Sequence, residues 1–580
     1  MKQQDIAALF HRTADLLELK GDSVFRVRAY QRAAQNLERF TGDLDALAQQ
    51  GALRTIPGIG TELAAKIAEY CASGRIAAYE TLARSVPSGL VELLEVPGLG
   101  PKTVKLLHDR RRIDSLEALE AAARAGKLRG LPGVQAKKEH NILRGIEILR
   151  RGRERMHLGV ALPLGQDLVR FLLKVPGVSR ASTAGSLRRM RETVGDLDVL
   201  AASQHPGRAM EAFTHAPFCA RILGAGSTKA SILTPDGLQV DLRVVTPESY
   251  GAALQYFTGS KEHNVHLREL AVRRGLKVNE YGVFRTATNR RVAGREEADV
   301  YRALGLPWIP PELREDTGEI DAALAGRLPK LLEASQLRGD FHIHTNWTDG
   351  HHTLEEMAAA GAAKGYEYLA ICDHSRSLRV ANGMSVDRLR QQLRAVRALS
   401  RRLRRLTLLT GAEVDILADG SLDYPDSVLR QLDVVVGSVH SHFRQDESTM
   451  TRRLIRAMRN PYLTIVGHPT GRLMGQRDPY GVNFDALFRA AKETQTALEI
   501  NAYPKRLDLG DGPARQAKQL GATLAISTDS HSRDQLDQVV FGVGIARRAW
   551  LEPADVLNCR SRVQLLAWIA AKRQRLAPAG

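Results

Sequence analysis

The sequence predicts a multidomain protein with an α-helical N-terminal region followed by α/β domains. A chain of 580 residues is too long for one hydrophobic core, so several domains are expected. The first part has helical spacing interrupted by short Pro-Gly turns. The rest alternates strand-like apolar runs with helical segments, and histidines and acidic residues gather at the ends of those runs. Functional residues of α/β folds collect at strand ends in this way.

The composition indicates a polyanionic partner. The chain has 83 Lys and Arg against 65 Asp and Glu, a formal net charge of +18. Residues 100–155 alone hold fifteen basic against seven acidic residues. The four cysteines are scattered and form no C-x-x-C motif, which fits a reducing compartment. Since no signal peptide or membrane-spanning apolar run is found, we expect a soluble, cytoplasmic protein with no membrane partner. We also expect a monomer.

The N-terminal region repeats one Pro-Gly turn motif between helical segments. Residues 56–60 read Ile-Pro-Gly-Ile-Gly, residues 96–100 read Val-Pro-Gly-Leu-Gly, and residues 131–134 carry a weaker copy. This pattern is typical of a helix–hairpin–helix, in which glycines permit a tight turn and the next helix offers N–H groups to a phosphate oxygen. A purely structural turn is the alternative for each copy. The repetition in a basic chain predicts sequence-independent DNA binding, with contacts at Gly58, Gly60, Gly98 and Gly100.

Three carboxylates in the middle of the chain are predicted to converge. Asp196 and Asp198 lie two apart in a short apolar run and would share one face of a strand. Asp241 lies in a second strand-like run, over residues 238–245, and could join them across a sheet. Convergent carboxylates repel one another unless cations lie between them. Two such cations could bind the attacking and leaving oxygens of a phosphoryl displacement. For an Asp-x-Asp pair considered alone, the alternative interpretation is a solvated strand end.

A Gly-Ser pair precedes these carboxylates. Gly185 lies eleven residues before Asp196, and Ser186 is followed by Arg188 and Arg189. The pair supplies close backbone approach and a hydroxyl, and the arginines supply cations for a triphosphate.

The C-terminal part carries a dense set of candidate metal ligands. Nine of the 17 histidines fall within residues 340–531, and His351, His352 and His442 are expected to be bystanders. The mixture of imidazole and carboxylate suits Zn²⁺, Mn²⁺ or Fe²⁺. A metal-bound hydroxide could attack phosphorus. The candidate ligands, each at or near the end of a strand-like run, are His342, His344, Asp349, His374, Glu413, His440, His468, Asp529 and His531.

These motifs resemble those of a known family. Gly-Ser-x-Arg-Arg followed by Gly-Asp-x-Asp-Val-Leu resembles the nucleotidyltransferase palm of family X DNA polymerases, and residues 256–260 and 279–282 resemble its thumb. The C-terminal ligand set resembles the site of PHP phosphoesterases, whose fold is a distorted β/α barrel. The family has a bacterial form with a C-terminal PHP domain, and the chain resembles that form over nearly its whole length.

The resemblance assigns roles to residues. Asp196, Asp198 and Asp241 would be catalytic and hold Mg²⁺ or Mn²⁺, and Arg268 would contact the template strand. Tyr256 and Phe257 would exclude a ribose hydroxyl. The PHP site would hold up to three Zn²⁺, Mn²⁺ or Fe²⁺ ions, with Glu413 bridging two. Val194 departs from members that place a serine there to contact the triphosphate. The implied deoxyribonucleoside triphosphate site comprises Gly185, Ser186, Arg189, Gly195, Tyr256, Phe257, Gly259 and Asn264.

Lys66 matches the Schiff-base lysine of the family's lyase domain, and Tyr30 also matches. Such a lysine must lose its proton, which burial or nearby cations favour. The alternative is a lysine that contacts phosphate. Further lysines of the lyase domain are replaced here by Arg26 and Glu62, which weakens the lyase interpretation.

The sequence therefore predicts a gap-filling DNA polymerase acting on gapped or primer-template DNA, joined to a 3′–5′ exonuclease or abasic-site nuclease. A small-metabolite phosphoesterase with a non-catalytic DNA-binding half is the alternative, and a non-enzymatic DNA scaffold is a second. The predicted domains are a lyase-like helical domain (1–80), a fingers-like helix–hairpin–helix domain (81–155), the palm (156–247), the thumb (248–308), a linker (309–337) and the PHP domain (338–580).

Overall fold

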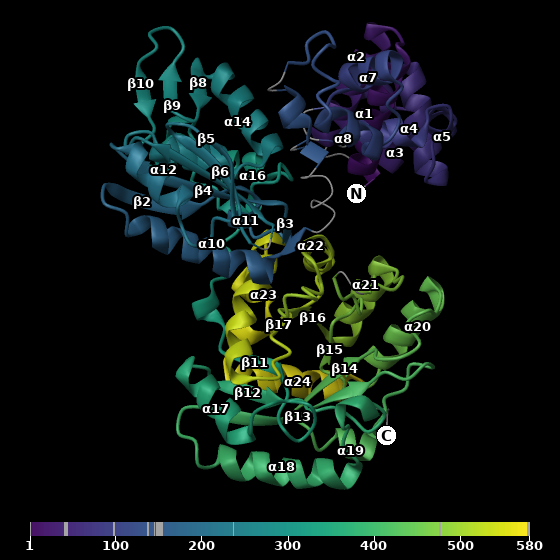
Figure 1. The fold of residues 1–580 in the computed structure, drawn as a ribbon. Coiled ribbons are helices and arrows are strands. Elements are labelled where there is room, and N and C mark those ends of the chain that lie inside the picture. Colours follow the sequence, from purple (N-terminus) through teal and green to yellow (C-terminus); the bar gives the residue numbers. More distant parts are fainter. Residues whose placement is uncertain are drawn as a thin grey trace. The chain divides into compact units, whose positions relative to one another are not determined.

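The computed structural model forms two compact units, Met1–Arg155 and Met156–Gly580 (Figure 1). It describes residues 2–39, 44–94, 96, 99–135, 138–143, 145–146, 155–235, 237–474 and 477–576. None of the helices in these ranges is long and apolar enough to cross a membrane.

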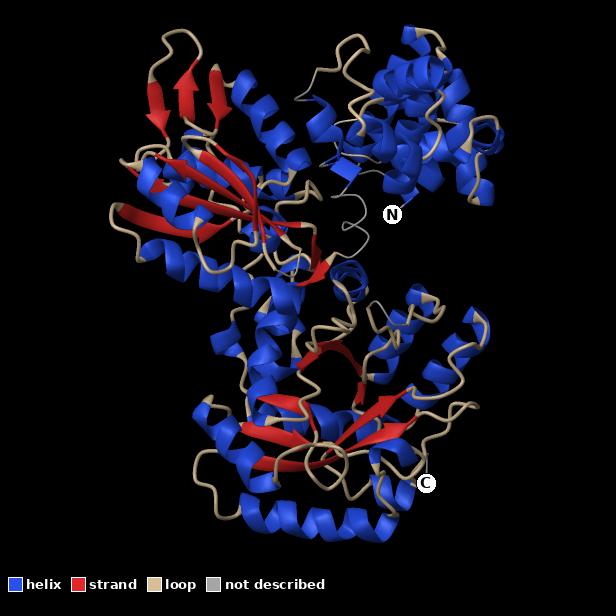
Figure 2. Cartoon of the chain, viewed as in Figure 1, coloured by secondary structure: helices blue, strands red, loops and turns tan. Residues whose placement is uncertain are grey.

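The described part of the first unit is α-helical (Figure 2). Two hydrophobic clusters form its core, one around Phe10 and Tyr30, whose rings meet edge to face at 5.4 Å, and one around Leu93 and Leu107. Its helices include α1 (Lys2–Lys20), α2 (Val24–Arg39), α3 (Leu44–Gln49), α4 (Thr61–Ser73), α5 (Ala77–Arg84), α6 (Ser88–Leu94), α7 (Pro101–Arg111) and α8 (Leu116–Arg124), with a 3-10 turn at Leu53–Thr55.

The predicted hairpins precede helix starts in this unit. Gly58 has φ +74°, a conformation that favours glycine, and Gly60 is the N-cap of α4. Gly100 is the N-cap of α7, and neither glycine has a side chain that could accept a hydrogen bond from the first N–H groups of its helix. Gly60 and Gly100 are both exposed, and in the described part of the chain no atom beyond their sequence neighbours would lie within 4 Å of an added Cβ. The surface at both helix starts is therefore uncovered by these residues. Gly98 lies outside the described residues.

The second unit begins with a five-stranded sheet, in the order β2-β4-β7-β6-β5. Only β4 and β7 pair in parallel, at its centre. The short strands β1 (Met156–His157) and β3 (Thr193–Val194) pair separately. The elements are α10 (Leu158–Leu173), β2 (Val178–Thr183), α11 (Gly185–Arg188), β4 (Asp196–Ser203), α12 (Pro206–Thr214), β5 (Arg221–Ala225), β6 (Lys229–Leu233) and β7 (Gln239–Val245).

Residues 250–324 pack around one further hydrophobic cluster. They contribute α13 (Tyr250–Thr258), α14 (Lys261–Arg273), β8 (Leu276–Asn279), β9 (Gly282–Arg285), β10 (Arg291–Ala293), α15 (Glu297–Ala303), η2 (Pro311–Leu313) and α16 (Glu319–Leu324). The sequence predicted a linker from residue 309, but Leu313 and Ile320 belong to this cluster. The fully buried Arg314 also donates to Glu297 at 2.6 Å. The charges in this segment therefore include a buried ion pair within a packed part of the fold.

The C-terminal part is a β/α barrel, as predicted. Seven parallel strands follow one another in chain order, and a bridge between Ile343 and Ser530 joins the first to the last. The strands are β11 (Gly339–Ile343), β12 (Tyr368–Ile371), β13 (Thr407–Asp415), β14 (Val434–Ser438), β15 (Ile465–Val466), β16 (Ala497–Asn501) and β17 (Leu524–Ser527). The helices are α17 (Leu354–Ala363), α18 (Val386–Ser400), α19 (Asp426–Leu429), α20 (Glu447–Met458), α21 (Phe484–Thr494), α22 (Asp511–Gln519), α23 (Val539–Arg548) and α24 (Arg562–Leu576).

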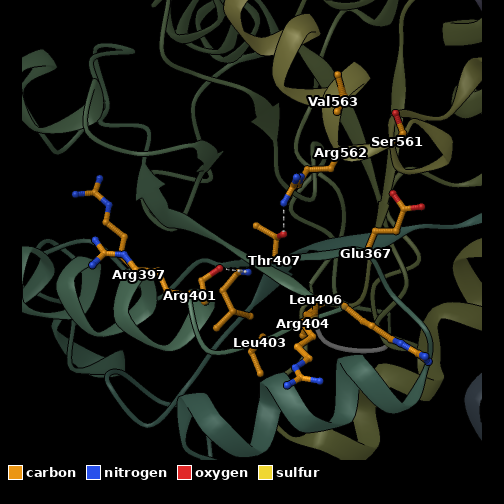
Figure 3. Close-up of a pocket in the computed structure, with 13 residues that line it drawn as sticks. Glu367, Arg397, Arg401, Leu403, Arg404, Leu406, Thr407, Ser561, Arg562 and Val563 are labelled. Carbon is orange, nitrogen blue, oxygen red and sulfur yellow. Dashed lines mark hydrogen bonds between the residues drawn. The ribbon is translucent and has the colours of Figure 1, made fainter.

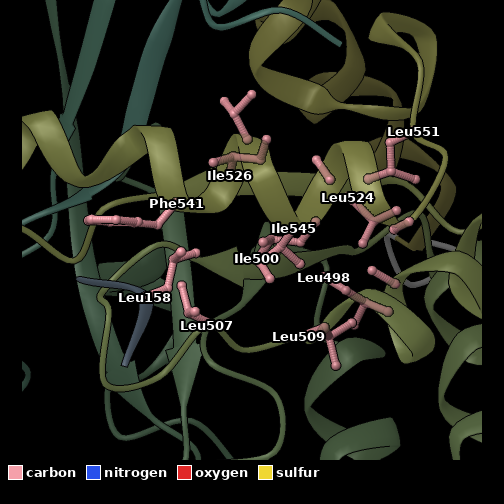
Figure 4. Close-up of a cluster of buried hydrophobic side chains, with 14 of the residues drawn as sticks. Leu158, Leu498, Ile500, Leu507, Leu509, Leu524, Ile526, Phe541, Ile545 and Leu551 are labelled. Carbon is pink, nitrogen blue, oxygen red and sulfur yellow. The ribbon is translucent and has the colours of Figure 1, made fainter. Parts of the chain in front are cut away.

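The largest hydrophobic cluster is shared by the five-stranded sheet domain and the barrel. Leu158 of α10 packs in the same cluster as Ile500, Leu507 and Phe541 (Figure 4). A Cβ added at Gly159 would lie 2.3 Å from Pro504, so the start of α10 approaches the barrel closely. These two parts of the chain are therefore joined by a common core.

Candidate active sites

The sheet brings the three predicted carboxylates to one face. Asp196 and Asp198 lie two residues apart on β4, and Asp198 is the direct neighbour of Asp241 on β7. Asp196 is exposed and the other two are half-buried. The face is open to solvent and acidic, and therefore suits hard cations that retain water and phosphate ligands.

Electrostatics at this face favour a bound cation. Burial and the charges of Asp196 and Asp241 raise the pKa of Asp198 to about 7. Asp241 accepts a hydrogen bond from Gln239 at 2.9 Å and lies 3.3 Å from the Lys229 ammonium. Carboxylates that crowd one another in this way are stabilised by a metal ion.

The backbone conformation of Gly185 and its contact with Asp198 require a glycine at this position. Gly185 begins α11 with φ +58°, and a Cβ there would lie 2.2 Å from Oδ2 of Asp198. Only a residue without a side chain satisfies both conditions. The turn that carries Ser186 and Arg189 is therefore held directly against Asp198.

Arg189 links this turn to the thumb and to the barrel. Its guanidinium donates to the carbonyl of Thr258 at 2.6 Å and to Glu315 at 3.1 Å. Arg548 of α23 donates to the same Glu315 oxygen and to the backbone carbonyl of Arg189, both at 2.8 Å. Arg548 also pairs with Asp511 at 2.6 Å, and its side chain is 3% exposed. The barrel thus holds the backbone of the predicted nucleotide-binding turn.

The predicted thumb residues lie on α13 and α14. Tyr256 and Phe257 meet edge to face at 5.1 Å, and Arg243 stacks on Phe257. Asn264 donates to the carbonyl of Tyr256 at 2.7 Å, and Arg268 donates to the carbonyl of Asn264. The aromatic pair is therefore fixed by α14, although the substrate roles of these residues, and of Gly195 and Gly259, stay predictions.

The barrel brings all nine candidate ligands to the carboxyl ends of its strands. Their ligand atoms form three groups within 4.8 Å: His344, Asp349, His374 and His531; His342, His344 and Asp529; and His374, Glu413 and His440. The ninth, His468, lies 3.1 Å from Glu413. His351, His352 and His442 belong to none of these groups.

Glu413 lies at the centre of the cluster. Its carboxylate is 1% exposed, and five imidazole rings lie within 4 Å of it: His342, His344, His374, His440 and His468. A carboxylate in that position can bridge two cations, and the imidazoles can complete their coordination.

The chemistry of the cluster fits divalent metal ions. Nε2 of His342 and both ring nitrogens of His344 are buried without a hydrogen-bond partner. Burial and the neighbouring rings of His531 and His374 lower the pKa of His344 to about 3. Burial and Arg506 lower the pKa of His468 to about 4. These two imidazoles favour the neutral form, which metal coordination requires. At the other four histidine ligands burial opposes protonation, but the surrounding carboxylates outweigh burial and raise the pKa.

Two carboxylates that the sequence analysis missed orient the ligands. Glu499 of β16 lies 2.8 Å from Nδ1 of His342 and accepts from the backbone N–H of His468 at 2.6 Å. Asp415 of β13 lies 2.6 Å from Nδ1 of His440. Such partners fix the tautomer of a metal-binding histidine. A charged residue within the apolar run Ala-Leu-Glu-Ile-Asn was the available signal for Glu499.

Lys66 lies beside a pocket of about 200 Å³ in the first unit. Its ammonium donates to Tyr30 at 2.5 Å and to Glu62. Burial disfavours the charged form, but these hydrogen bonds outweigh burial and raise the pKa of Lys66. This shift is opposite to the one that a Schiff-base lysine needs.

Comparison with known families assigns most of the chain. Residues 253–315 match the DNA polymerase beta thumb, and residues 340–502 match the PHP domain. Residues 1–76 match a helix-hairpin-helix domain, and residues 90–147 match a SAM-like helix-hairpin-helix tandem. The predicted hairpins, thumb and barrel are confirmed. The molecule therefore belongs to the class in which helix-hairpin-helix elements and a polymerase thumb are joined to a PHP domain. A polymerase and a PHP domain both imply divalent metal ions.

Known relatives narrow this class to one family. The "DNA polymerase/3′-5′ exonuclease PolX" of Bacillus subtilis (strain 168) is 39% identical over 98% of this chain and 99% of its own length. Probable phosphatases of Thermoanaerobacter sp. (strain X514) and Caldanaerobacter subterraneus subsp. tengcongensis are 26% and 28% identical over 38% and 33% of this chain, and over 89% and 75% of their own lengths. The chain belongs to the PolX family of DNA polymerase/3′-5′ exonucleases.

Proposed function

We propose that the palm adds deoxyribonucleotides to a DNA primer in repair gaps, with Mg²⁺ or Mn²⁺ bound by Asp196, Asp198 and Asp241. The pairing of Asp198 with Asp241 beneath the Gly185 turn is the observation that carries this proposal. The cations would supply charge stabilisation for the phosphoryl transfer. Ser186, Arg189 and the N–H groups of the turn would hold the triphosphate, and Asp241 would accept or orient the proton of the primer hydroxyl.

The aromatic pair of α13 supports a role in sugar selection. Tyr256 and Phe257 would form a wall against the sugar of the incoming nucleotide, and α14 would hold that wall through Asn264. A ribonucleotide adds one hydroxyl, which a packed wall rejects sterically.

We propose that the barrel degrades DNA from the 3′ end. Its ligand set would hold up to three Zn²⁺, Mn²⁺ or Fe²⁺ ions, which activate water and stabilise charge on phosphate. Glu413 would bridge two of them, because its carboxylate is surrounded by imidazoles. Glu499 and Asp415 would fix the rings of His342 and His440. Cleavage of DNA at abasic sites is a second candidate activity of the barrel, because it uses the same metal-assisted hydrolysis of a phosphodiester.

The helix–hairpin–helix elements support sequence-independent DNA binding by the first unit. The open starts of α4 and α7, after Gly60 and Gly100, offer N–H groups to phosphate oxygens. Arg268 would contact the template strand. The charged ammonium of Lys66 favours a phosphate contact over lyase chemistry. We further propose that the protein acts as a monomer in the cytoplasm.

A paired assay on the full chain tests the two activities. Primer extension with deoxyribonucleotides and degradation of the same primer without them are measured with Mg²⁺ and with Mn²⁺ separately. We expect extension and degradation to show different metal preferences, because their ligand sets differ. A chain that hydrolyses small phosphate esters but neither extends nor degrades DNA would instead support the small-metabolite phosphoesterase.

A further inference from the structure

A groove lined by arginines lies at the end of the barrel opposite the metal ligands. It has a volume of about 620 Å³ and is lined by residues around the starts of β13 and α24, among them Thr407 and Ser561 (Figure 3). Thr407 lies six residues before Glu413 on β13, a separation of roughly 20 Å at about 3.3 Å per residue. The groove is therefore separate from the metal cluster. We call it the arginine groove, and its arginines are Arg397, Arg401, Arg404, Arg405 and Arg562.

The arginine groove concentrates unneutralised charge. Between Asp387 and Glu413 the chain carries eight arginines and no acidic residue. Glu367 is the one carboxylate that lines the described groove, and it already pairs with Arg338. Like charges held together cost free energy unless an anion neutralises them.

Three of the groove arginines are available to a ligand. Within the described part of the chain, the guanidiniums of Arg401, Arg404 and Arg405 have neither an ion pair nor a hydrogen bond, and all three side chains are exposed. The other two have neutral partners. Arg562 donates to the hydroxyl of Thr407 at 2.6 Å, and Arg397 donates to the carbonyl of Gln431 at 2.8 Å. Neither of these acceptors carries a negative charge that would neutralise a guanidinium.

The lining indicates what kind of anion would bind. Serine and threonine hydroxyls lie among the arginines, and both group types bind phosphate oxygens. No aromatic side chain lines the groove in the described residues, so it offers no platform on which bases could stack. A single phosphate would neutralise at most two charges, whereas a nucleic-acid backbone presents a row of them.

We propose that the arginine groove binds a nucleic-acid backbone without regard to sequence. It would hold the DNA at a distance from the 3′ end that the metal cluster degrades. A strand held at both places dissociates more slowly, because the second contact becomes intramolecular. This inference rests on the proposed nuclease function and adds a second contact region to it.

The test compares two double variants of the full chain that remove equal charge. Arg401→Gln with Arg404→Gln empties the groove of two free arginines. Arg394→Gln with Arg459→Gln is the matched control, since both are exposed arginines that do not line the groove. Affinity for a 30-nucleotide single strand is measured against salt concentration. Each backbone contact contributes about 0.7 to the slope of log affinity against log salt, so we expect the groove variant to lose about 1.4 and the control much less.

Activity measurements separate this proposal from the proposed function. The groove variant should degrade a five-nucleotide strand at the wild-type rate and a 30-nucleotide strand with a raised KM. Equal slopes of log affinity against log salt for the two variants, with nuclease activity intact, would contradict DNA binding by the arginine groove. Wild-type protein that neither binds nor degrades DNA would instead overturn the proposed function.

Two further measurements keep the test decisive. Modification of arginines in the wild-type chain by phenylglyoxal, mapped by mass spectrometry, needs no variant, and DNA should protect Arg401 and Arg404 more than Arg394. Loss of this protection pattern would contradict the proposal even if a variant failed to fold. Binding to phosphatidylserine vesicles that depends on the groove, with unchanged DNA binding, would assign the surface to a membrane and overturn it as well.

Discussion

The palm face and the barrel cluster gather acidic groups in two different ways. The palm presents carboxylates from neighbouring strands, with Asp196 exposed and Asp198 half-buried. The barrel buries Glu413 at the centre of its ligands and surrounds this carboxylate with imidazoles. Imidazoles offer nitrogen ligands without adding negative charge, so they can be gathered around a buried carboxylate, whereas carboxylates alone repel one another and lose hydration on burial. The palm is therefore suited to ions that exchange with substrate, and the barrel to ions that stay bound.

The largest effect is expected from Asp198→Ala. Nucleotide addition should fall by roughly 10³-fold or more, because several kcal/mol of transition-state stabilisation would be lost. Degradation of the 3′ end and DNA affinity serve as internal controls and should remain near wild type. Primer extension above a tenth of the wild-type rate would contradict the role of Asp198.

Glu413→Ala addresses the other region. Degradation of a 3′ end should fall by roughly 100-fold or more and bound metal per chain should decrease, since the central carboxylate is removed. Nucleotide addition should persist, because the palm has its own carboxylates. Both rates and the metal content are measured on one preparation. Lower metal content with an unchanged degradation rate would make the cluster structural.

Glu499→Gln sharpens the comparison, because Glu499 is a charged group that orients a histidine ligand of the barrel. The substitution keeps size but removes the charge that faces Nδ1 of His342. We expect metal affinity or nuclease activity to fall by about 10–100-fold. Asp433→Asn is the control, since Asp433 accepts from Thr410 at the opposite end of the barrel. Equal metal retention by the two variants would show that Glu499 acts only on stability.

The substitution with the smallest expected effect, Arg548→Ala, tests whether the palm and the barrel act independently. Arg548→Ala removes the contact between α23 and the backbone of Arg189. We expect KM for the nucleotide to rise by roughly 5–10-fold, about 1 kcal/mol, with a smaller change in kcat and an unchanged nuclease rate.

Arg547→Ala is the matched control for that substitution. Arg547 lies next to Arg548 on α23 but pairs with Glu312 and Glu333 and does not contact Arg189. Its loss should affect thermal stability without raising KM. The same KM shift in both variants would show that Arg548 stabilises the fold in general and does not specifically position the backbone of Arg189.

Sequence alone predicted the features that depend on local periodicity. The spacing of Asp196 and Asp198, and of His342 and His344, gives a shared strand face, and the Pro-Gly repeats gave the hairpins. It did not reveal features that depend on burial. The charged segment from residue 309 suggested a linker because a buried Arg314 looks like an exposed one in sequence. Glu499 was missed because strand-end placement was the criterion, and Glu499 lies within a strand.

The core shared by α10 and the barrel has a consequence for dissecting the chain. Cutting before residue 338 would leave Leu158 on one fragment and Ile500 and Phe541 on the other, each with an apolar face newly exposed to water. Exposed patches of this kind promote aggregation. A weak or insoluble polymerase fragment would therefore report the loss of its packing partner rather than the loss of nuclease chemistry, so point substitutions in the intact chain are the sound way to assign the two activities.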